Sequence, residues 1–321
     1  MFTRRQTLIA TAAAFAGPAG AQAPFPQRPV TLVVPFAPGG IADITARAVA
    51  EPMARLLGQP VVVDNKPSAG SIVASQTVAT AKPDGHTLLL LSNGNAVSVG
   101  LFRKLPYDTL TAFAPITTLA AFDIGLFVAA SSRFSTLAAL VAHARANPGR
   151  LNVGTVAAGS TQHLAAKLFE TVAGLDVLVV PYKGTPAVLT ALRAGEIDLA
   201  FEIVGPMLPQ VQAGALRALA VSSALRNPAL PQVPTVQQAA GLAYDVASWN
   251  ALAAPAGTPP EVVERLRAAA HEALASPAVR DKLGALGVRP TGSSPAELQA
   301  LLAREVQRWG AVIKKAGIEP E

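Results

Sequence analysis

Residues 29–43 read PVTLVVPFAPGGIAD, and this stretch decides the fold. The β-branched run from Val30 to Pro35 is bounded by prolines and is typical of a strand buried on both faces. The prolines and glycines from Phe36 to Gly40 predict a tight turn. Apolar residues then recur at helical spacing from Ile41 to Leu57, and Gly58 ends the pattern. Strand, glycine-rich turn and helix in this order open a parallel α/β unit.

The same plan continues along the chain and then repeats. Val61 to Asp64 and Thr87 to Leu91 are the next predicted strands, and they complete a first unit. A second unit of strands and helices is predicted between residues 151 and 221, with strands at Leu151–Thr155, Val177–Pro181, Ile197–Glu202 and Leu216–Val221. Each unit therefore predicts a mostly parallel sheet flanked by helices.

Two segments are expected to cross between the units, Leu119–Ala130 and Asp245–Ala254. Three helices that follow the second crossing are expected to pack on the first unit. The sequence therefore predicts an α/β protein of two lobes with a cleft between them. Lobe 1 is expected to comprise residues 24–124 and 246–321, and lobe 2 residues 125–245.

The first 23 residues are predicted to be a secretory signal rather than part of the fold. Arg4 and Arg5 precede a short apolar run and a series of small residues. Cleavage after Ala21 is favoured over cleavage after Ala23, and both the general and the twin-arginine export routes stay open. A membrane anchor is the alternative, but the apolar run is short for a span. We therefore expect an exported, periplasmic protein.

Composition excludes several classes of protein. The chain has 321 residues, of which 51% are hydrophobic and 14% charged, so it can bury a large core. It contains no cysteine, which excludes disulfides, thiolate catalysis and cysteine-bound metals. Its four histidines have no metal-binding spacing, and no cofactor motif occurs. No basic run with interleaved aromatics suggests nucleic acid as a partner.

Each predicted unit has a glycine-rich helix start, at Gly39 and Gly40 in the first unit and at Gly159 and Ser160 in the second. The first four N–H groups of a helix lack internal partners, and the helix dipole adds about half a positive charge there. A carboxylate or phosphate can bind such a start without any arginine. The alternative is that these glycines only make tight turns.

Ser160 and His163 lie three residues apart at the second helix start, which invites a nucleophile-and-base interpretation. An N-cap serine with a packed histidine explains the pair better. Asp43 is expected in the first turn of its helix, with a direct ligand contact as the alternative. The sequence therefore predicts no catalytic residues, and Trp309 is expected in the core.

Several blocks of the sequence resemble the Bug-type extracytoplasmic receptors of tripartite tricarboxylate transporters. The resemblance covers essentially the whole mature chain, in order. It is carried by residues 29–43, LGQPVVVDNKP at 57–67, PDG at 83–85, KLPYD at 104–108, GSTQHL at 159–164, VPYKG at 180–184, ALAVS at 218–222, PQVPT at 231–235 and APAGTP at 254–259.

The resemblance implies a periplasmic-binding-protein (Venus flytrap) fold that captures a small organic carboxylate and delivers it to membrane permease subunits. It also implies a monomer that binds no cofactor. Carried onto this chain, it predicts ligand-binding residues in three groups. These are a first clamp of Phe36, Gly39, Gly40 and Ile41, a floor of Ser92 and Asn93, and a second lobe with Ser160, Thr161, Thr185 and Glu202, together with Ser248.

The chain departs from the family pattern at the first loop and in the second lobe. Ile41 and Ala42 stand where a hydroxyl residue is common, so a less polar ligand is expected at that end. Glu202 stands where aspartate is common, and it either faces the cleft or lies at a solvated strand end. Two alternative functions stay open: a receptor that signals to a membrane sensor, and a secreted α/β enzyme acting on a carboxylate.

Overall fold

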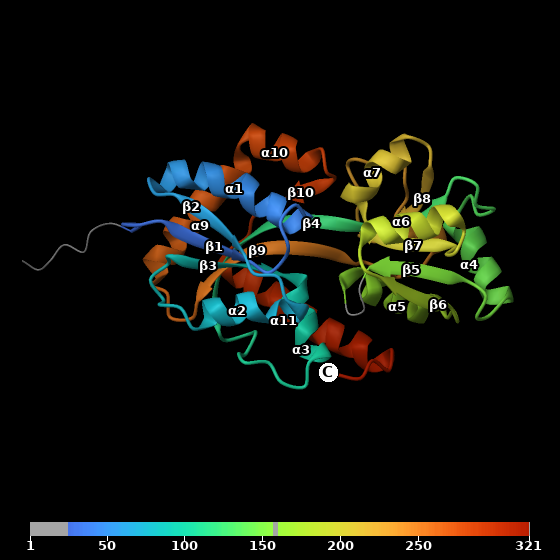
Figure 1. Ribbon diagram of the computed structural model, residues 1–321, viewed down its shortest axis with the longest axis horizontal. Helices are drawn as coiled ribbons and strands as arrows, with labels where there is room; N and C mark the ends of the chain where they lie inside the picture. The colour runs from blue at the N-terminus through green and yellow to red at the C-terminus, as the bar shows by residue number, and fades with distance from the viewer. Residues whose placement is uncertain (1–24, 157–159, 321) are drawn as a thin grey trace, which may run out of the picture.

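The computed structural model describes residues 25–156 and 160–320 (Figure 1). The predicted export signal, Met1 to Ala23, lies outside the described residues. Gly159 and its two preceding neighbours in the second glycine-rich turn lie outside them too. Within the described part of the chain, no helix has the length and apolar character that crossing a membrane requires.

The strands form one continuous mixed sheet in the order β2-β1-β3-β9-β4-β7-β5-β6, and β8 and β10 pair with β4. The first parallel unit comprises β1 (Val30–Val34), β2 (Val61–Asn65) and β3 (Thr87–Ser92). The second comprises β5 (Asn152–Val156), β6 (Leu178–Tyr182) and β7 (Leu199–Ile203). Both units lie where the sequence predicts them. The antiparallel strands are β4 (Phe113–Ala129), β8 (Leu216–Val221), β9 (Ala247–Pro255) and β10 (Val288–Pro290).

Strand β4 connects the two halves of the molecule (Figure 1). Its residues 113–123 pair with β9. From Ile124 onward it pairs with β7 and β8 instead. Strand β9 lies in the first half. The chain therefore returns from the second half just before β9. At this point the Val246 amide donates to the Ser222 carbonyl at 2.9 Å. The result is the two-lobed α/β architecture that the sequence predicts.

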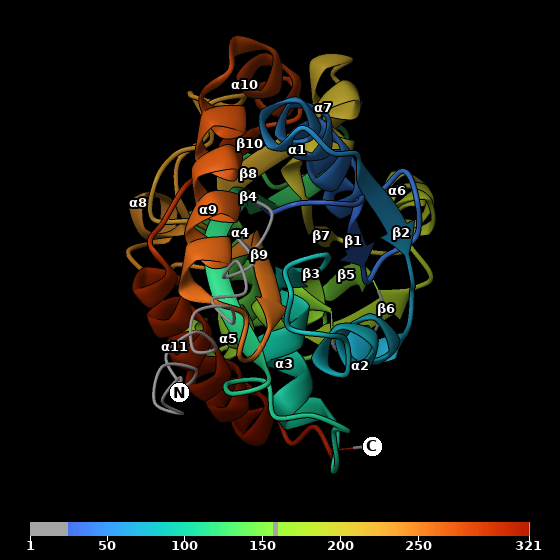
Figure 2. The same cartoon turned by 90° about the vertical axis from the view of Figure 1, so that its left-hand side faces the viewer.

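Helices cover both faces of each half. In the first half, α1 (Ile41–Leu57) and α10 (Pro277–Gly284) lie above the sheet, and α3 (Asn93–Leu101) and α11 (Pro295–Lys315) lie below it (Figures 1 and 2). The remaining helices of this half are α2 (Ile72–Ala79) and α9 (Pro260–Ala275), with the short η1 (Ala69–Ser71) before α2. The second half carries α4 (Leu137–Ala146), α5 (Thr161–Ala173), α6 (Thr185–Ala194), α7 (Val204–Gln212) and α8 (Val236–Ala240).

Helix α11 packs on α3 and β4 and also contacts α5 of the other half. Its Trp309 is fully buried, as predicted, in a core that includes residues of both halves. The Trp309 indole N–H donates to the side-chain oxygen of Asn93 at 2.9 Å. The C-terminal helix therefore holds the start of α3 in place, and α3 borders the site described below.

A buried ion pair lies on β4 where this strand changes partners. The Asp123 side chain is 0% exposed and accepts two hydrogen bonds of 2.7 Å from Arg289 of β10. Asn227, from the second half, donates to Asp123 at 2.8 Å and to the Gly287 carbonyl of the first half at 3.0 Å. This cluster links the two halves at their shared strand.

Removal of the Asp123 carboxylate should therefore destabilise the fold strongly. Asp123→Ala leaves Arg289 and Asn227 without their buried acceptor, and we expect a loss of about 3 kcal/mol or more in the free energy of unfolding. Glu51→Ala breaks the exposed Glu51–Arg55 pair and is the matched control, with an expected loss of about 0.5 kcal/mol. Urea denaturation of both variants measures the difference. Equal losses would show that the cluster does not hold the halves together.

Candidate functional site

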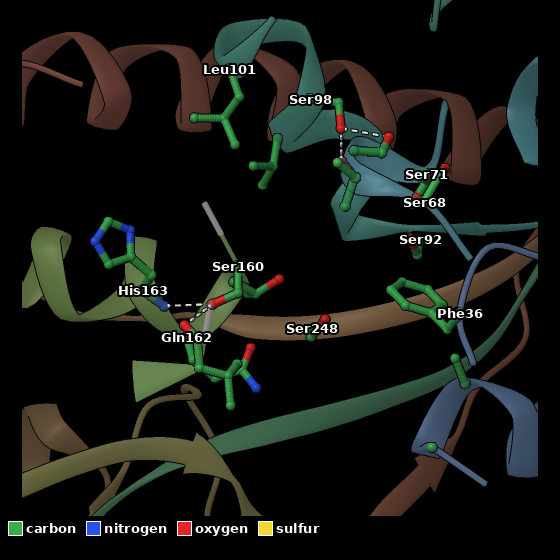
Figure 3. A pocket seen from close by; sticks show the side chains of 18 of the residues that line it. Phe36, Ser68, Ser71, Ser92, Ser98, Leu101, Ser160, Gln162, His163 and Ser248 are labelled. Carbon is green, nitrogen blue, oxygen red and sulfur yellow. Dashed lines mark hydrogen bonds between the residues drawn. The ribbon is translucent and has the colours of Figure 1, made fainter. Parts of the chain in front are cut away.

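A cavity of about 670 Å³ lies between the two halves of the molecule (Figure 3). Phe36 and Ser92 border it from the first half, and Ser160 and Gln162 border it from the second. Ser248 of β9 lies between these two groups. The carboxyl ends of parallel strands in both halves meet here, which is where open α/β sheets bind ligands.

Four helices begin at this cavity. Gly40, Ile41 and Ala42 belong to the start of α1, Ser71 precedes α2, and Ser92 and Gly94 lie at the start of α3. The fourth start is that of α5, from residues 160–163. Each brings the positive end of its dipole, and α1, α3 and α5 also bring amide N–H groups without helical partners. At α2 the Ile72 and Val73 amides already donate to the Ala69 carbonyl and the Ser68 hydroxyl. No lysine or arginine is among the described residues that line the cavity, so these backbone groups supply its positive potential.

The first loop is held in shape by Asp43. Its carboxylate accepts hydrogen bonds from the Gly39 amide at 2.9 Å, from Arg47 at 3.0 Å and from Asn65 at 3.0 Å. Burial acts to raise the pKa of Asp43, but these hydrogen bonds and the Arg47 charge outweigh it and hold the pKa below its usual range. Because Gly39 uses its N–H for Asp43, the free amides of this loop begin at Gly40. Asp43 is thus in the first turn, as predicted, and it positions the loop.

A cluster of small polar residues forms the part of the cavity that faces Phe36. A Cβ added to Gly94 would lie 3.3 Å from the Ser92 hydroxyl, 3.4 Å from the Ser71 hydroxyl and 4.0 Å from the Phe36 ring. Ser71 adopts a left-handed conformation with φ of 61°, which is uncommon for a non-glycine residue and occurs often at binding sites. We call Ser71, Ser92 and Gly94, with the start of α1, the lobe 1 pole.

On the opposite side, the side chains at the start of α5 already have protein partners. The Ser160 hydroxyl accepts from the His163 amide at 3.1 Å and donates to the Val156 carbonyl at 2.9 Å. The Thr161 hydroxyl accepts from Asn93 at 3.1 Å, which joins the starts of α3 and α5 across the cavity. Ser160 is therefore the N-cap of α5, as predicted.

Glu202 lies behind this second side and is not a solvated strand end. It is 0% exposed, and one of its carboxyl oxygens accepts from Gln162 at 3.5 Å and from the Ile203 amide at 3.2 Å. The other oxygen has no hydrogen-bond partner within the described residues. Burial raises the pKa of Glu202 to about 7, although hydrogen bonds from Gln162, Ile203 and Thr185 oppose the shift.

The cavity contains seven of the eleven residues predicted to bind the ligand: Phe36, Gly40, Ile41, Ser92, Ser160, Thr161 and Ser248. The other four do not line it, namely Gly39, Asn93, Thr185 and Glu202. Asn93 is fully buried between Thr161 and Trp309 rather than on the floor. The Gly39 amide donates to Asp43, Glu202 accepts from Gln162, and Thr185 neighbours Glu202.

Sequence reasoning missed many of the residues that line the cavity, including most of the apolar ones. These are Ser68, Ala69, Gly70, Ser71, Val97, Ser98, Leu101, Phe102, Phe122, Val156, Gln162, His163, Ile203, Asn250, Ile318 and Glu319, besides Ala42 and Gly94. Ser71 and Gly94 belong to segments rich in serine and glycine, a composition that accompanies close backbone approach to a ligand. The apolar residues carry no such signal.

The family of this chain follows from comparison with known proteins. The model of the tripartite tricarboxylate transporter family receptor matches residues 45–318, and the chain belongs to this family. A relative from Pseudomonas sp. (strain P51), encoded between tcbD and tcbE, is 40% identical over 290 residues, which are 90% of this chain and 86% of the relative.

Solved structures agree with this assignment. The periplasmic binding protein BugD has 31% identity and a TM-score of 0.79 over 92% of this chain and 100% of its own. The structure of R. palustris Rpa4515 with adipate has 36% identity and a TM-score of 0.82 over 93% of this chain and 100% of its own. The predicted resemblance and the periplasmic-binding-protein fold are thus confirmed, and family members are solute-binding receptors.

Glu202 should make stability depend on pH. A carboxyl whose pKa is about 7 when folded and near 4.5 when unfolded binds its proton more tightly in the folded state. The contribution of Glu202 to stability is therefore fully present below pH 4.5 and is lost as pH rises through 7, by about 3 kcal/mol in total. Glu202→Gln removes this dependence. Urea denaturation at pH 5 and pH 8 should show a larger loss in the wild type than in the variant. The same pH dependence in both proteins would contradict the assignment.

Proposed function

We propose that this protein is an exported receptor that captures a small organic carboxylate between its lobes and delivers it to a tripartite tricarboxylate-type membrane permease. The observation that carries the proposal is the convergence of four helix starts on one cavity whose described lining has no lysine or arginine. The adipate in the R. palustris relative supports a carboxylate as the ligand. The likeness to a periplasmic binding protein supports export, with residues 1–23 as the cleaved signal. The proposed working form is a monomer.

In this proposal the ligand stabilises a closed arrangement of two lobes, residues 24–124 with 246–321 and residues 125–245. The change of β4 partners after Asp123 supports the first boundary. Two contacts between the halves support this proposal. Asn93 donates to Thr161, and a Cβ at Gly205 would lie 2.7 Å from the Leu286 carbonyl oxygen of the other half. A ligand that bridges the lobes adds contacts only in the closed state and so shifts the population toward it.

The residues of the site divide into those that contact the ligand and those that position them. The amides of Gly40 and Ile41 and the groups of the lobe 1 pole hold the carboxylate, and Phe36 covers it. Gly39 and Asn93 act as positioning residues through Asp43 and Thr161. Thr185 and Glu202 act through Gln162.

A receptor role explains the site better than an enzyme role. The one serine–histidine pair suggested by the sequence is not arranged for nucleophilic attack, because the Ser160 hydroxyl caps α5 through the His163 backbone amide. Delivery to a permease, rather than signalling to a sensor, is the role that the family's name supports.

A thermal-shift screen of the mature protein against mono-, di- and tricarboxylates tests the carboxylate assignment. At a ligand concentration of 100 times Kd, binding adds about 2.7 kcal/mol to the free energy of unfolding and raises Tm by several degrees. The corresponding alcohols should give no shift. If no acid raises Tm, the receptor proposal fails.

Gly40→Val tests the first clamp. The backbone of Gly40 is extended, and only the Ala37 carbonyl, 3.8 Å away, would meet a Cβ there, so the fold should tolerate valine. Valine at the cavity wall should weaken acid binding at least tenfold in calorimetry. Gly284→Val adds the same side chain at a position with open space, away from the cavity, and should keep full affinity. Unchanged affinity in Gly40→Val would remove the first clamp from the proposal.

A further inference from the structure

The cavity is walled by large apolar side chains on two sides. Val97, Leu101 and Phe102 come from α3 and the residue that follows it, and Ile41, Phe122 and Ile203 come from α1, β4 and β7. A ligand that places hydroxyl or amino groups against such walls loses hydrogen bonds to water without replacing them. Carbon atoms placed there gain from burial instead. The apolar walls therefore favour a ligand whose part away from the carboxylate is apolar.

Side chains that are free to bind a carboxylate lie at the lobe 1 pole and on β9. The hydroxyls of Ser71 and Ser248 line the cavity and make no hydrogen bond to any described residue. On the opposite side, the Ser160 hydroxyl both donates and accepts within the protein, and the Thr161 hydroxyl accepts from Asn93. The starts of α1 and α3 add amides to the first side, although the Ser92 amide itself donates to the Asn95 side chain at 3.0 Å. At α2 the Ile72 and Val73 amides already donate to the Ala69 carbonyl and the Ser68 hydroxyl. One carboxylate therefore finds its best position at the lobe 1 pole.

The opposite side disfavours a second carboxylate. The side-chain nitrogen of Gln162 donates to the Glu202 carboxyl, which lies behind it. This hydrogen bond directs the side-chain NH2 group of Gln162 toward Glu202. Burial and the Lys167 charge lower the pKa of His163, so its imidazole is neutral at pH 7. Lys167 itself is paired with Glu170 at 3.0 Å. A second ligand carboxylate would meet the start of α5 but no side-chain cation among the described lining residues, with the Glu202 carboxyl close behind.

We propose that the ligand of this receptor is a carboxylic acid with a single carboxylate, held at the lobe 1 pole, and an uncharged apolar body, aryl or alkyl, that fills the space between the α3 wall and the sheet. This inference rests on the proposed function and narrows the ligand class. It distinguishes this chain from its relative with adipate, a dicarboxylate.

Two matched sets of acids test the inference by titration calorimetry on the mature chain at pH 7. The alkyl set is hexanoate, adipate and gluconate, which share six carbons and differ by a second carboxylate or by hydroxyls. The aryl set is benzoate, terephthalate and gallate, which differ in the same way. In at least one set the first acid should bind at least tenfold more tightly than the other two. A dicarboxylate or a hydroxylated acid as the tightest ligand would overturn the inference and leave the receptor function intact. If none of the six acids binds, and neither malate nor citrate does, the proposed function fails with it.

Two variants locate the effect in the cavity. Ile41→Thr keeps the branched shape but adds a hydroxyl at the wall, and it should weaken binding of the apolar acid about three- to fivefold. Ile44→Thr makes the same change on α1 outside the cavity and should leave affinity unchanged. Glu202→Gln should raise the affinity for the dicarboxylate relative to the monocarboxylate. An unaltered ratio in Glu202→Gln would show that Glu202 does not set this preference.

Discussion

Helix N-termini that lack hydrogen-bond partners are the constraint on which this structure depends. Four helices begin at one cavity, and their first amides have no helical acceptors. Protein groups satisfy some of these amides: Asp43 accepts from Gly39, the Ser160 hydroxyl from His163, and the Ser68 hydroxyl from Val73. The described lining offers no lysine or arginine, so an anion there pairs with backbone dipoles and hydroxyl groups. The site is therefore polar at the helix starts and apolar between them.

The fold creates this convergence by sharing one strand between two halves. The starts of α1 and α3 lie at the strand ends of one parallel unit, and the start of α5 lies at the strand ends of the other. Strand β4 holds these two ends opposite each other. The Asp123–Arg289 pair with Asn227 fixes the two halves at this strand, and Trp309 fixes the start of α3 through Asn93.

The sequence was sufficient to predict the two α/β units, the first crossing segment and the helix starts of α1 and α5. The return crossing lies just before β9 rather than along the predicted Asp245–Ala254. β-branched runs, prolines and glycines mark these elements strongly. It was not sufficient for α3, since the residues SNGNAVSVG at 92–100 have low helix propensity and form a helix that packs against α11. The cavity's apolar wall was missed for the same reason, because Leu101, Phe122 and Ile318 are ordinary core-type residues until tertiary contacts place them. Glu202 sits at a strand end, where the pattern left two orientations open, and burial between α5 and β7 decided the outcome.

A crystal structure of the mature protein with its tightest-binding acid is the most direct measurement. The account predicts a carboxylate between Phe36 and Gly94, with its oxygens about 3 Å from the amides or hydroxyls at the starts of α1, α2 and α3. A carboxylate bound instead to a lysine or arginine, or an acid bound outside the space between the halves, would contradict it.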